Sequence, residues 1–203
     1  GGFFDWVQLE YGRRLLAANG MTVRVEGLAE AGITSPVVFV SNHISWVDIW
    51  ALLAALPGTT RFVFKKELSR IPFFGPSINA MGHIAIDRAN HSSAFGSYER
   101  AAEQIRGGTS AIIFPEGTRS LTGRLLPFKR APFVLAIAAQ VPVVPVVCVA
   151  THERLPKGSL TPRPGPITLR IGTPIPTTGL DYGARTRLAE EARAAMVALG
   201  AAE

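Results

Sequence analysis

The chain has 203 residues, a length typical of one domain with a full hydrophobic core, and no repeat or low-complexity tract divides it. Its 21 lysine and arginine residues outnumber 15 aspartate and glutamate residues, which suits an acidic partner such as anionic lipid or a phosphate ester. We expect no nucleic-acid partner, because zinc-ligand spacing and known nucleic-acid-binding motifs are missing. A single cysteine excludes an intrachain disulfide, and four histidines without paired carboxylate or cysteine ligands argue against a metal site.

Residues 1–20 have the pattern of an amphipathic helix. One stripe at helical spacing is apolar, with charged residues elsewhere around the helix, and consists of Phe4, Val7, Tyr11, Leu15 and Ala18. Such a helix either lies in a membrane interface or packs on the sheet, and the sequence supports both readings equally. We assign residues 1–20 to a candidate membrane-interface helix. The chain begins Gly1-Gly2 without a methionine, which leaves room for an anchoring segment before it.

The next apolar run, residues 36–40, predicts a buried parallel strand, and it changes abruptly into the polar segment 41–48. That segment holds His43 and Asp48. A neutral imidazole can take a proton from a hydroxyl near neutral pH, and a carboxylate on its other nitrogen fixes the tautomer. On one regular helix the two side chains would lie about 140° apart, so we expect His43 in the turn and Asp48 inside the following helix. The alternative is a hydrogen-bonded histidine beside an aspartate that the helix dipole favours.

Residues 62–68, 71–76 and 81–88 are typical of a strand, a short helix and a second strand. Lys65 and Lys66 leave the first strand and Arg88 closes the second. These cations can therefore reach the sheet edge where His43 lies, although a lysine pair is equally typical of a solvated face.

Residues 92–106 predict an amphipathic helix, and the run 111–114 predicts another buried strand. Polar residues follow this strand as well, in the segment Phe114 to Ser120. Gly117 permits a tight turn, and Arg119 presents a fork of donors suited to a phosphate or carboxylate. The alternative is a solvated Arg119, or an Arg119 paired with Glu116.

The carboxy-terminal half completes an α/β pattern. Residues 131–150 are almost wholly apolar, but Pro132, Gln140, Pro142 and Pro145 interrupt them, so we expect a helix and then a strand and not a membrane span. Cys148 falls in that strand and is expected in the core. Residues 156–166 read as a loop, 167–171 as a half-buried strand and 182–199 as a closing helix. The fold class is therefore α/β, a single domain with a mixed, mostly parallel sheet flanked by helices.

Four blocks of residues, spanning about residues 36 to 150, resemble the motifs of the lysophospholipid and glycerophosphate acyltransferases, in particular the bacterial 1-acyl-glycerol-3-phosphate acyltransferases. The blocks are Asn42, His43 and Asp48; Lys66-Glu67-Leu68, Pro72, Gly75, Gly82 and Ile86-Asp87-Arg88; Phe114 to Ser120; and Val141 to Val146. The match departs at Ala131, where the family commonly has glycine, and this departure concerns the backbone turn and not the chemistry.

The resemblance implies an acyltransferase domain over residues 21–203, with His43 and Asp48 catalytic. It implies acyl transfer from an acyl thioester to the free sn-2 hydroxyl of lysophosphatidate, with no metal or bound cofactor and with acyl-coenzyme A or acyl carrier protein as the donor. The residues expected to bind the substrate are Lys66, Arg88, Glu116, Gly117, Thr118 and Arg119. For the oxyanion, backbone N–H groups at the helix start after His43 are the expected donors.

The expected partners are a lysolipid in the membrane, the acyl donor and an anionic membrane surface. We expect the protein at the cytoplasmic face of the inner membrane, bound peripherally or anchored by a segment outside this chain. Two alternatives stay open. One is the same chemistry on glycerol-3-phosphate or a lyso-ornithine lipid. The other is a protein that binds lipid phosphates without catalysis, which would not need a general base.

Overall fold

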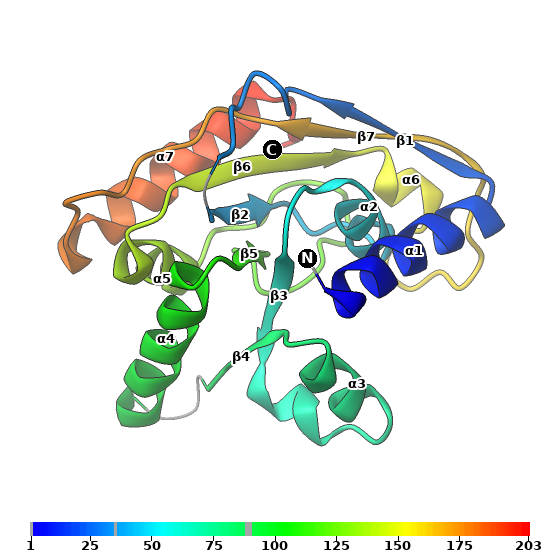
Figure 1. Cartoon of the computed structure of the whole chain (residues 1–203). Coiled ribbons are helices and arrows are strands. Elements are labelled where there is room, and N and C mark those ends of the chain that lie inside the picture. The colour runs from blue at the N-terminus through cyan, green and yellow to red at the C-terminus, as the bar shows by residue number, and fades with distance from the viewer. Residues whose placement is uncertain (1, 35, 88–90) are drawn as a thin grey trace.

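A seven-stranded sheet forms the centre of the part of the chain that the computed structural model describes, residues 2–34, 36–87 and 91–203, with only the backbone for 91–95 (Figure 1). The strand order is β1-β7-β6-β2-β5-β3-β4. The strands are β1 (Met21–Glu26), β2 (Val38–Ser41), β3 (Thr60–Lys65), β4 (Ile84–Ile86), β5 (Ser110–Ile113), β6 (Val143–Val149) and β7 (Gly165–Ile171).

The strands from β2 to β6 all run in the same direction. β7 is antiparallel to β6, and β1 is parallel to β7 at the sheet edge. The prediction of a mixed, mostly parallel sheet is therefore confirmed. Because β2 to β6 are parallel, their carboxyl ends lie at one edge, where open α/β sheets bind their ligands.

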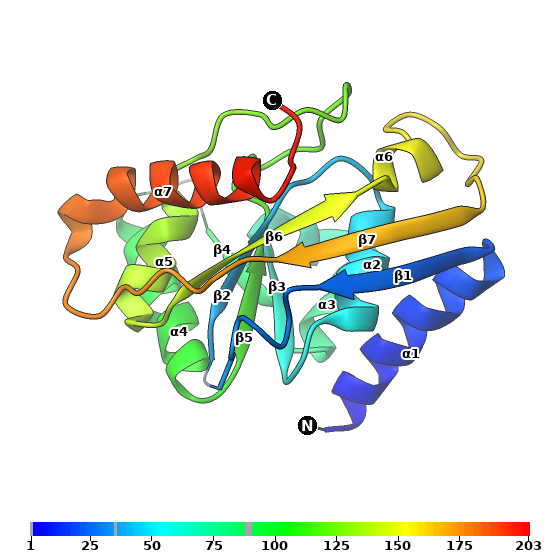
Figure 2. The ribbon, with the colours of Figure 1, turned by 90° about the horizontal axis from the view of Figure 1, so that it is seen from above.

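Helices cover both faces of this sheet. Figure 2 shows α4, α5 and α7 on one side and α1 and α2 on the other. The helices are α1 (Phe3–Ala18), α2 (Val47–Ala55), α3 (Phe74–Ala80), α4 (His91–Arg106), α5 (Ala131–Ala139), α6 (Thr151–Arg154) and α7 (Arg185–Ala198), with the 3₁₀ turns η1 (Lys66–Arg70) and η2 (Tyr182–Ala184).

The central strand β2 is buried on both faces, as its unbroken apolar sequence predicts. Val38 and Val40 pack in the core beneath α4, α5 and α7, whereas Phe39 points to the opposite core beneath α1 and α2. All three side chains are fully buried. The alternation of successive side chains therefore fixes β2 between two hydrophobic layers and holds its carboxyl end in place.

Helix α1 packs on α2 through a face that the apolar stripe does not predict. Its buried residues are Gln8, Gly12 and Leu16. A side chain at Gly12 would place a Cβ atom 2.6 Å from the carbonyl oxygen of Trp50, so glycine allows the two helices to approach closely. The aromatic side of α1 faces outward, with Trp6 56% exposed and Phe3 69% exposed. The helix is thus packed on the domain and still presents aromatic side chains, and its membrane-interface role stays a prediction.

The predicted parse of residues 131–150 is confirmed, because α5 is followed by strand β6. Ala131, the departure from the family pattern, begins α5, and Arg130 before it has an ordinary helical φ of −76°. No helix in the described residues combines the length and hydrophobicity that a membrane span requires. Strand β1 was not predicted, although it alternates apolar residues with Thr22, Arg24 and Glu26, which is the pattern of a half-buried strand, here at the sheet edge.

Candidate active site

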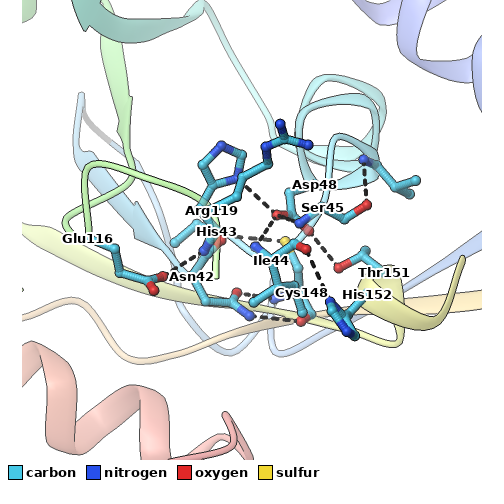
Figure 3. Close-up of polar contacts among 12 residues, drawn as sticks. Asn42, His43, Ile44, Ser45, Asp48, Glu116, Arg119, Cys148, Thr151 and His152 are labelled. Carbon is cyan, nitrogen blue, oxygen red and sulfur yellow. Dashed lines mark hydrogen bonds and ion pairs between the residues drawn. The ribbon is translucent and has the colours of Figure 1, made fainter. Parts of the chain in front are cut away.

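His43 and Asp48 meet at the carboxyl end of β2. The chain leaves the strand at Ser41, and Asp48 lies in the first turn of α2, as the spacing predicts. His43 Nδ1 is 3.0 Å from Asp48 Oδ2 (Figure 3). Because an ionised carboxylate only accepts, the neutral imidazole in this contact carries its proton on Nδ1 and has its lone pair on Nε2. This is the tautomer that a general base needs.

The Asp48 carboxylate is fully buried and held by further donors. Its Oδ2 accepts from the backbone N–H groups of Ile44 at 2.7 Å and Ser45 at 2.8 Å. Its Oδ1 accepts from the Thr151 hydroxyl at 2.5 Å. Hydrogen bonds of this kind fix the orientation of the carboxylate toward His43.

The same contacts correct the expected oxyanion site. The N–H groups of Ile44 and Ser45 are occupied by Asp48, and that of Val47 donates to the Ser45 hydroxyl at 3.0 Å. The expectation that the backbone after His43 supplies the oxyanion donors is therefore wrong for these three positions. The sequence could not show this, because it does not reveal that the Asp48 side chain turns back over its own loop.

Asn42 fastens the loop to the neighbouring strand β6. Its side-chain amide donates to the Cys148 carbonyl at 3.0 Å, and its oxygen accepts from the Cys148 N–H at 2.7 Å. The Cys148 thiol is buried, and burial raises its pKa well above the usual range. The prediction of a core cysteine is confirmed, and the buried neutral thiol is not placed for nucleophilic chemistry.

Strand β5 brings a second loop against His43. The Phe114 ring stacks on the imidazole, with the ring centres 3.8 Å apart and the planes at 12°. The next acidic residue, Glu116, accepts from the His43 N–H at 2.7 Å and from the Leu126 N–H at 2.8 Å. Glu116 therefore joins the β5 loop to the His43 loop and orders both.

Burial raises the pKa of Glu116 to about 7. The hydrogen bonds from the two backbone N–H groups lower this pKa, but burial has the larger effect. The nearby Asp48 carboxylate adds to the rise. Both Glu116 oxygens face backbone, and the residue is only 3% exposed. This position favours ordering of the loop over direct contact with a substrate, and it excludes the alternative in which Glu116 pairs with Arg119.

Arg119 is the cation at this site. Its guanidinium carbon lies 4.5 Å from the centre of the Trp46 ring, and the side chain is partly exposed. No carboxylate of a described residue lies within ion-pair distance of it. In Figure 3 the Arg119 guanidinium and the His43 ring both extend away from the loop backbone. An arginine stacked on an aromatic ring and free of an acidic partner can bind an anion beside His43.

Comparison with known proteins places this geometry in a family. Residues 22–149 match the model of a family described as Acyltransferase. The chain belongs to this acyltransferase family.

Curated relatives of the acyltransferase family carry a common name. A 1-acyl-sn-glycerol-3-phosphate acyltransferase from Cocos nucifera is 39% identical over 82% of this chain and 54% of its own. The alpha form of the same enzyme from Homo sapiens is 34% identical over 88% of this chain and 63% of its own. The chain thus spans little more than half the length of these relatives.

A solved structure of the acyltransferase family has the same fold. The crystal structure of the 1-acyl-sn-glycerophosphate acyltransferase PlsC from Thermotoga maritima matches with a TM-score of 0.78 and 29% identity, over 98% of this chain and 80% of that chain. The predicted α/β class is confirmed by this match and by the sheet.

The other residues predicted to bind substrate lie in η1 and in the loop after strand β5. Lys66, in η1 after strand β3, pairs with Asp87 at 3.1 Å and is largely exposed. Gly117 has a φ of +71° and Thr118 is exposed, so both form the outer turn of the loop before Arg119. Arg88 lies outside the described residues.

Thr151 contacts the site but was not among the predicted residues. It follows strand β6 at the same sheet edge as His43 and Arg119, and that position was the available signal. Its side chain is fully buried, and its hydroxyl holds the second oxygen of Asp48. Because Thr151 contacts Asp48 and not the imidazole, it is a positioning residue for the predicted His43–Asp48 dyad.

We expect Thr151→Val to lower kcat about tenfold and the free energy of unfolding by about 1–3 kcal/mol, because Asp48 loses a hydrogen bond to a charged group. Thr151→Ser keeps the hydroxyl and should retain most of the wild-type activity. The test is kcat across pH for both variants with their thermal unfolding. Equal pH profiles and rates for the valine and serine variants would show that the hydroxyl does not act on the dyad.

Proposed function

We propose that this chain transfers a fatty acyl group from an acyl thioester to the free sn-2 hydroxyl of lysophosphatidate, giving phosphatidate. The observation that carries the proposal is the His43–Asp48 hydrogen bond with Arg119 on the adjacent loop. A base oriented by a buried carboxylate suits deprotonation of a hydroxyl, and the cation beside it suits a phosphate. The names of the relatives support the same reaction.

In the proposed reaction, His43 Nε2 takes the proton of the acceptor hydroxyl while the hydroxyl oxygen attacks the carbonyl carbon of the thioester. Asp48 stabilises the imidazolium that forms, because its carboxylate already holds Nδ1–H. The carbon–sulfur bond then breaks, the new ester remains on the lipid, and the imidazolium proton passes to the departing thiolate. The reaction needs no metal or bound cofactor, since the thioester is a cosubstrate.

Arg119 holds the acceptor phosphate in this proposal and so positions the hydroxyl at His43. We expect Arg119→Ala to raise KM for lysophosphatidate about tenfold to a hundredfold with a smaller change in kcat, because a charge-assisted hydrogen bond is lost. The matched control is Arg185→Ala, an arginine that stacks on Tyr182 at the start of α7. An unchanged KM for Arg119→Ala would place the phosphate elsewhere.

The experiment that tests the function is release of free thiol from palmitoyl-coenzyme A and from palmitoyl acyl carrier protein, each with and without lysophosphatidate. Release that depends on lysophosphatidate supports the reaction and identifies the donor. Parallel reactions with glycerol-3-phosphate and a lyso-ornithine lipid compare the acceptors. Binding of lysophosphatidate without release from either donor would count against an enzyme.

A further inference from the structure

Two loops form a continuous border around the His43 loop. The Lys157 ammonium donates to the Arg119 carbonyl at 2.9 Å and so joins residues 155–164 to residues 117–130. The Ser45 hydroxyl donates to the Leu155 carbonyl at 2.8 Å, and the Ser120 N–H donates to the His43 carbonyl at 2.8 Å. Each loop is thus fastened directly to the segment that carries the imidazole. We call these two loops, together with Trp46, the basic rim.

The basic rim exposes large apolar side chains. Leu160 is 95% exposed, Leu121 is 69% exposed and Trp46 is 47% exposed. Leu160 lies in a loop that has prolines at 162 and 164. In this loop only Pro156 forms a β-bridge, with Ser45, so the segment around Leu160 extends from the domain surface. The Lys157–Arg119 hydrogen bond joins the loops that carry the two leucines, so both apolar side chains belong to the border of the site.

The charge of the basic rim has one sign. Residues 117–130 and 155–164 contain no aspartate or glutamate, and their cations are Arg119, Arg124, Lys129, Arg130, Lys157 and Arg163. The acidic groups near the rim are already engaged. Glu153 pairs with Arg154 at 3.3 Å, Glu203 pairs with Arg193, and Asp48 and Glu116 are buried. The rim therefore offers apolar side chains within a field of positive charge.

We propose that the basic rim docks on an anionic bilayer, with Leu121 and Leu160 inserted among the acyl chains and the arginines and lysines at the level of the lipid phosphates. This combination of apolar tips and surrounding cations is what binding to an anionic interface requires. The inference rests on the proposed function, because it delivers the His43 site to an acceptor whose acyl chain lies in the membrane. It is separate from the exposed aromatic side of α1.

The test uses flotation with vesicles of phosphatidylcholine containing phosphatidylglycerol, and with vesicles of phosphatidylcholine alone. The Leu121→Ser, Leu160→Ser double variant should bind anionic vesicles at least tenfold more weakly than the wild type, although α1 is intact. The matched control is Tyr182→Ser, which removes an aromatic side chain that is 59% exposed on η2 and should bind as the wild type does. Wild-type binding should fall with salt and be weak on neutral vesicles.

A second readout separates docking from chemistry. With a short-chain lysophosphatidate dissolved as a monomer, the double variant should keep wild-type turnover, whereas with lysophosphatidate embedded in vesicles it should lose turnover about as much as it loses binding. If the wild type does not turn over the monomeric acceptor, the proposed function is contradicted. The docking proposal is then tested by flotation alone. Unchanged flotation of the double variant would overturn the docking proposal. The docking proposal would also be overturned if the double variant lost turnover only with acyl carrier protein as the donor. That result would assign the basic rim to binding of the acyl carrier protein.

Discussion

Replacing His43 by alanine should lower kcat by about 10²–10⁴-fold, the usual contribution of a positioned general base. The fold should survive, because the backbone contacts of His43 to Glu116 and Ser120 do not involve its side chain. The lost ring contact with Phe114 should cost about 1 kcal/mol of stability. Thiol release that depends on lysophosphatidate measures the rate, and thermal unfolding measures the fold.

A control for the His43→Ala variant is its affinity for lysophosphatidate, which should stay near the wild-type value because Arg119 is unchanged. A low rate with normal affinity and normal unfolding would assign the loss to proton transfer. If the variant kept most of its turnover, the proposed mechanism would be wrong, and another group would have to accept the hydroxyl proton.

The second large effect is expected from Asp48→Asn, which should reduce kcat by about 10²–10⁴-fold and also destabilise the fold by about 2–4 kcal/mol. An asparagine can accept with its oxygen only, whereas Asp48 accepts from the N–H groups of Ile44 and Ser45 with Oδ2 and from the Thr151 hydroxyl with Oδ1. In one orientation the amide N–H₂ would face these two N–H groups and the imidazole, and in the other it would face the Thr151 hydroxyl. In both orientations the negative charge that stabilises the imidazolium is lost.

The two effects of Asp48→Asn can be measured apart. Equilibrium unfolding in denaturant gives the loss of stability, and initial rates at a temperature where the variant is fully folded give the loss of turnover. The matched control is Asp181→Asn, which alters a surface carboxylate that caps η2 and should change neither quantity by much. Wild-type turnover from a folded Asp48→Asn variant would remove Asp48 from the mechanism.

The centre of the fold was predictable because its strands are buried on both faces and appear in the sequence as unbroken apolar runs. β2 and β5 lie within two residues of their predicted bounds. The edge strand β1 was not predicted, although it alternates apolar and polar residues as 167–171 does, because its three apolar residues are a weaker signal than an unbroken apolar run. The position of α1 was only half predictable, because its contact with α2 depends on the absence of a side chain at Gly12 and not on a hydrophobic stripe.

The candidate site followed the same division. His43, Asp48 and Arg119 were predictable because each lies just beyond a parallel strand, where polar residues interrupt an apolar run. Thr151 lies at the equivalent position after β6, but an uncharged hydroxyl in the sequence is a weak signal of a site, and it was not predicted. The destinations of the Ile44 and Ser45 N–H groups could not be predicted, since they depend on which way the Asp48 side chain turns.

The Phe114 ring lies flat on one face of the imidazole at a separation of 3.8 Å, and Asp48 holds Nδ1 at its edge. A turn of the imidazole about its Cβ–Cγ bond would break both contacts at once. The basic nitrogen Nε2 therefore keeps one direction before any substrate arrives. Under the proposed function, the acceptor hydroxyl must approach along that direction, in the plane of the ring.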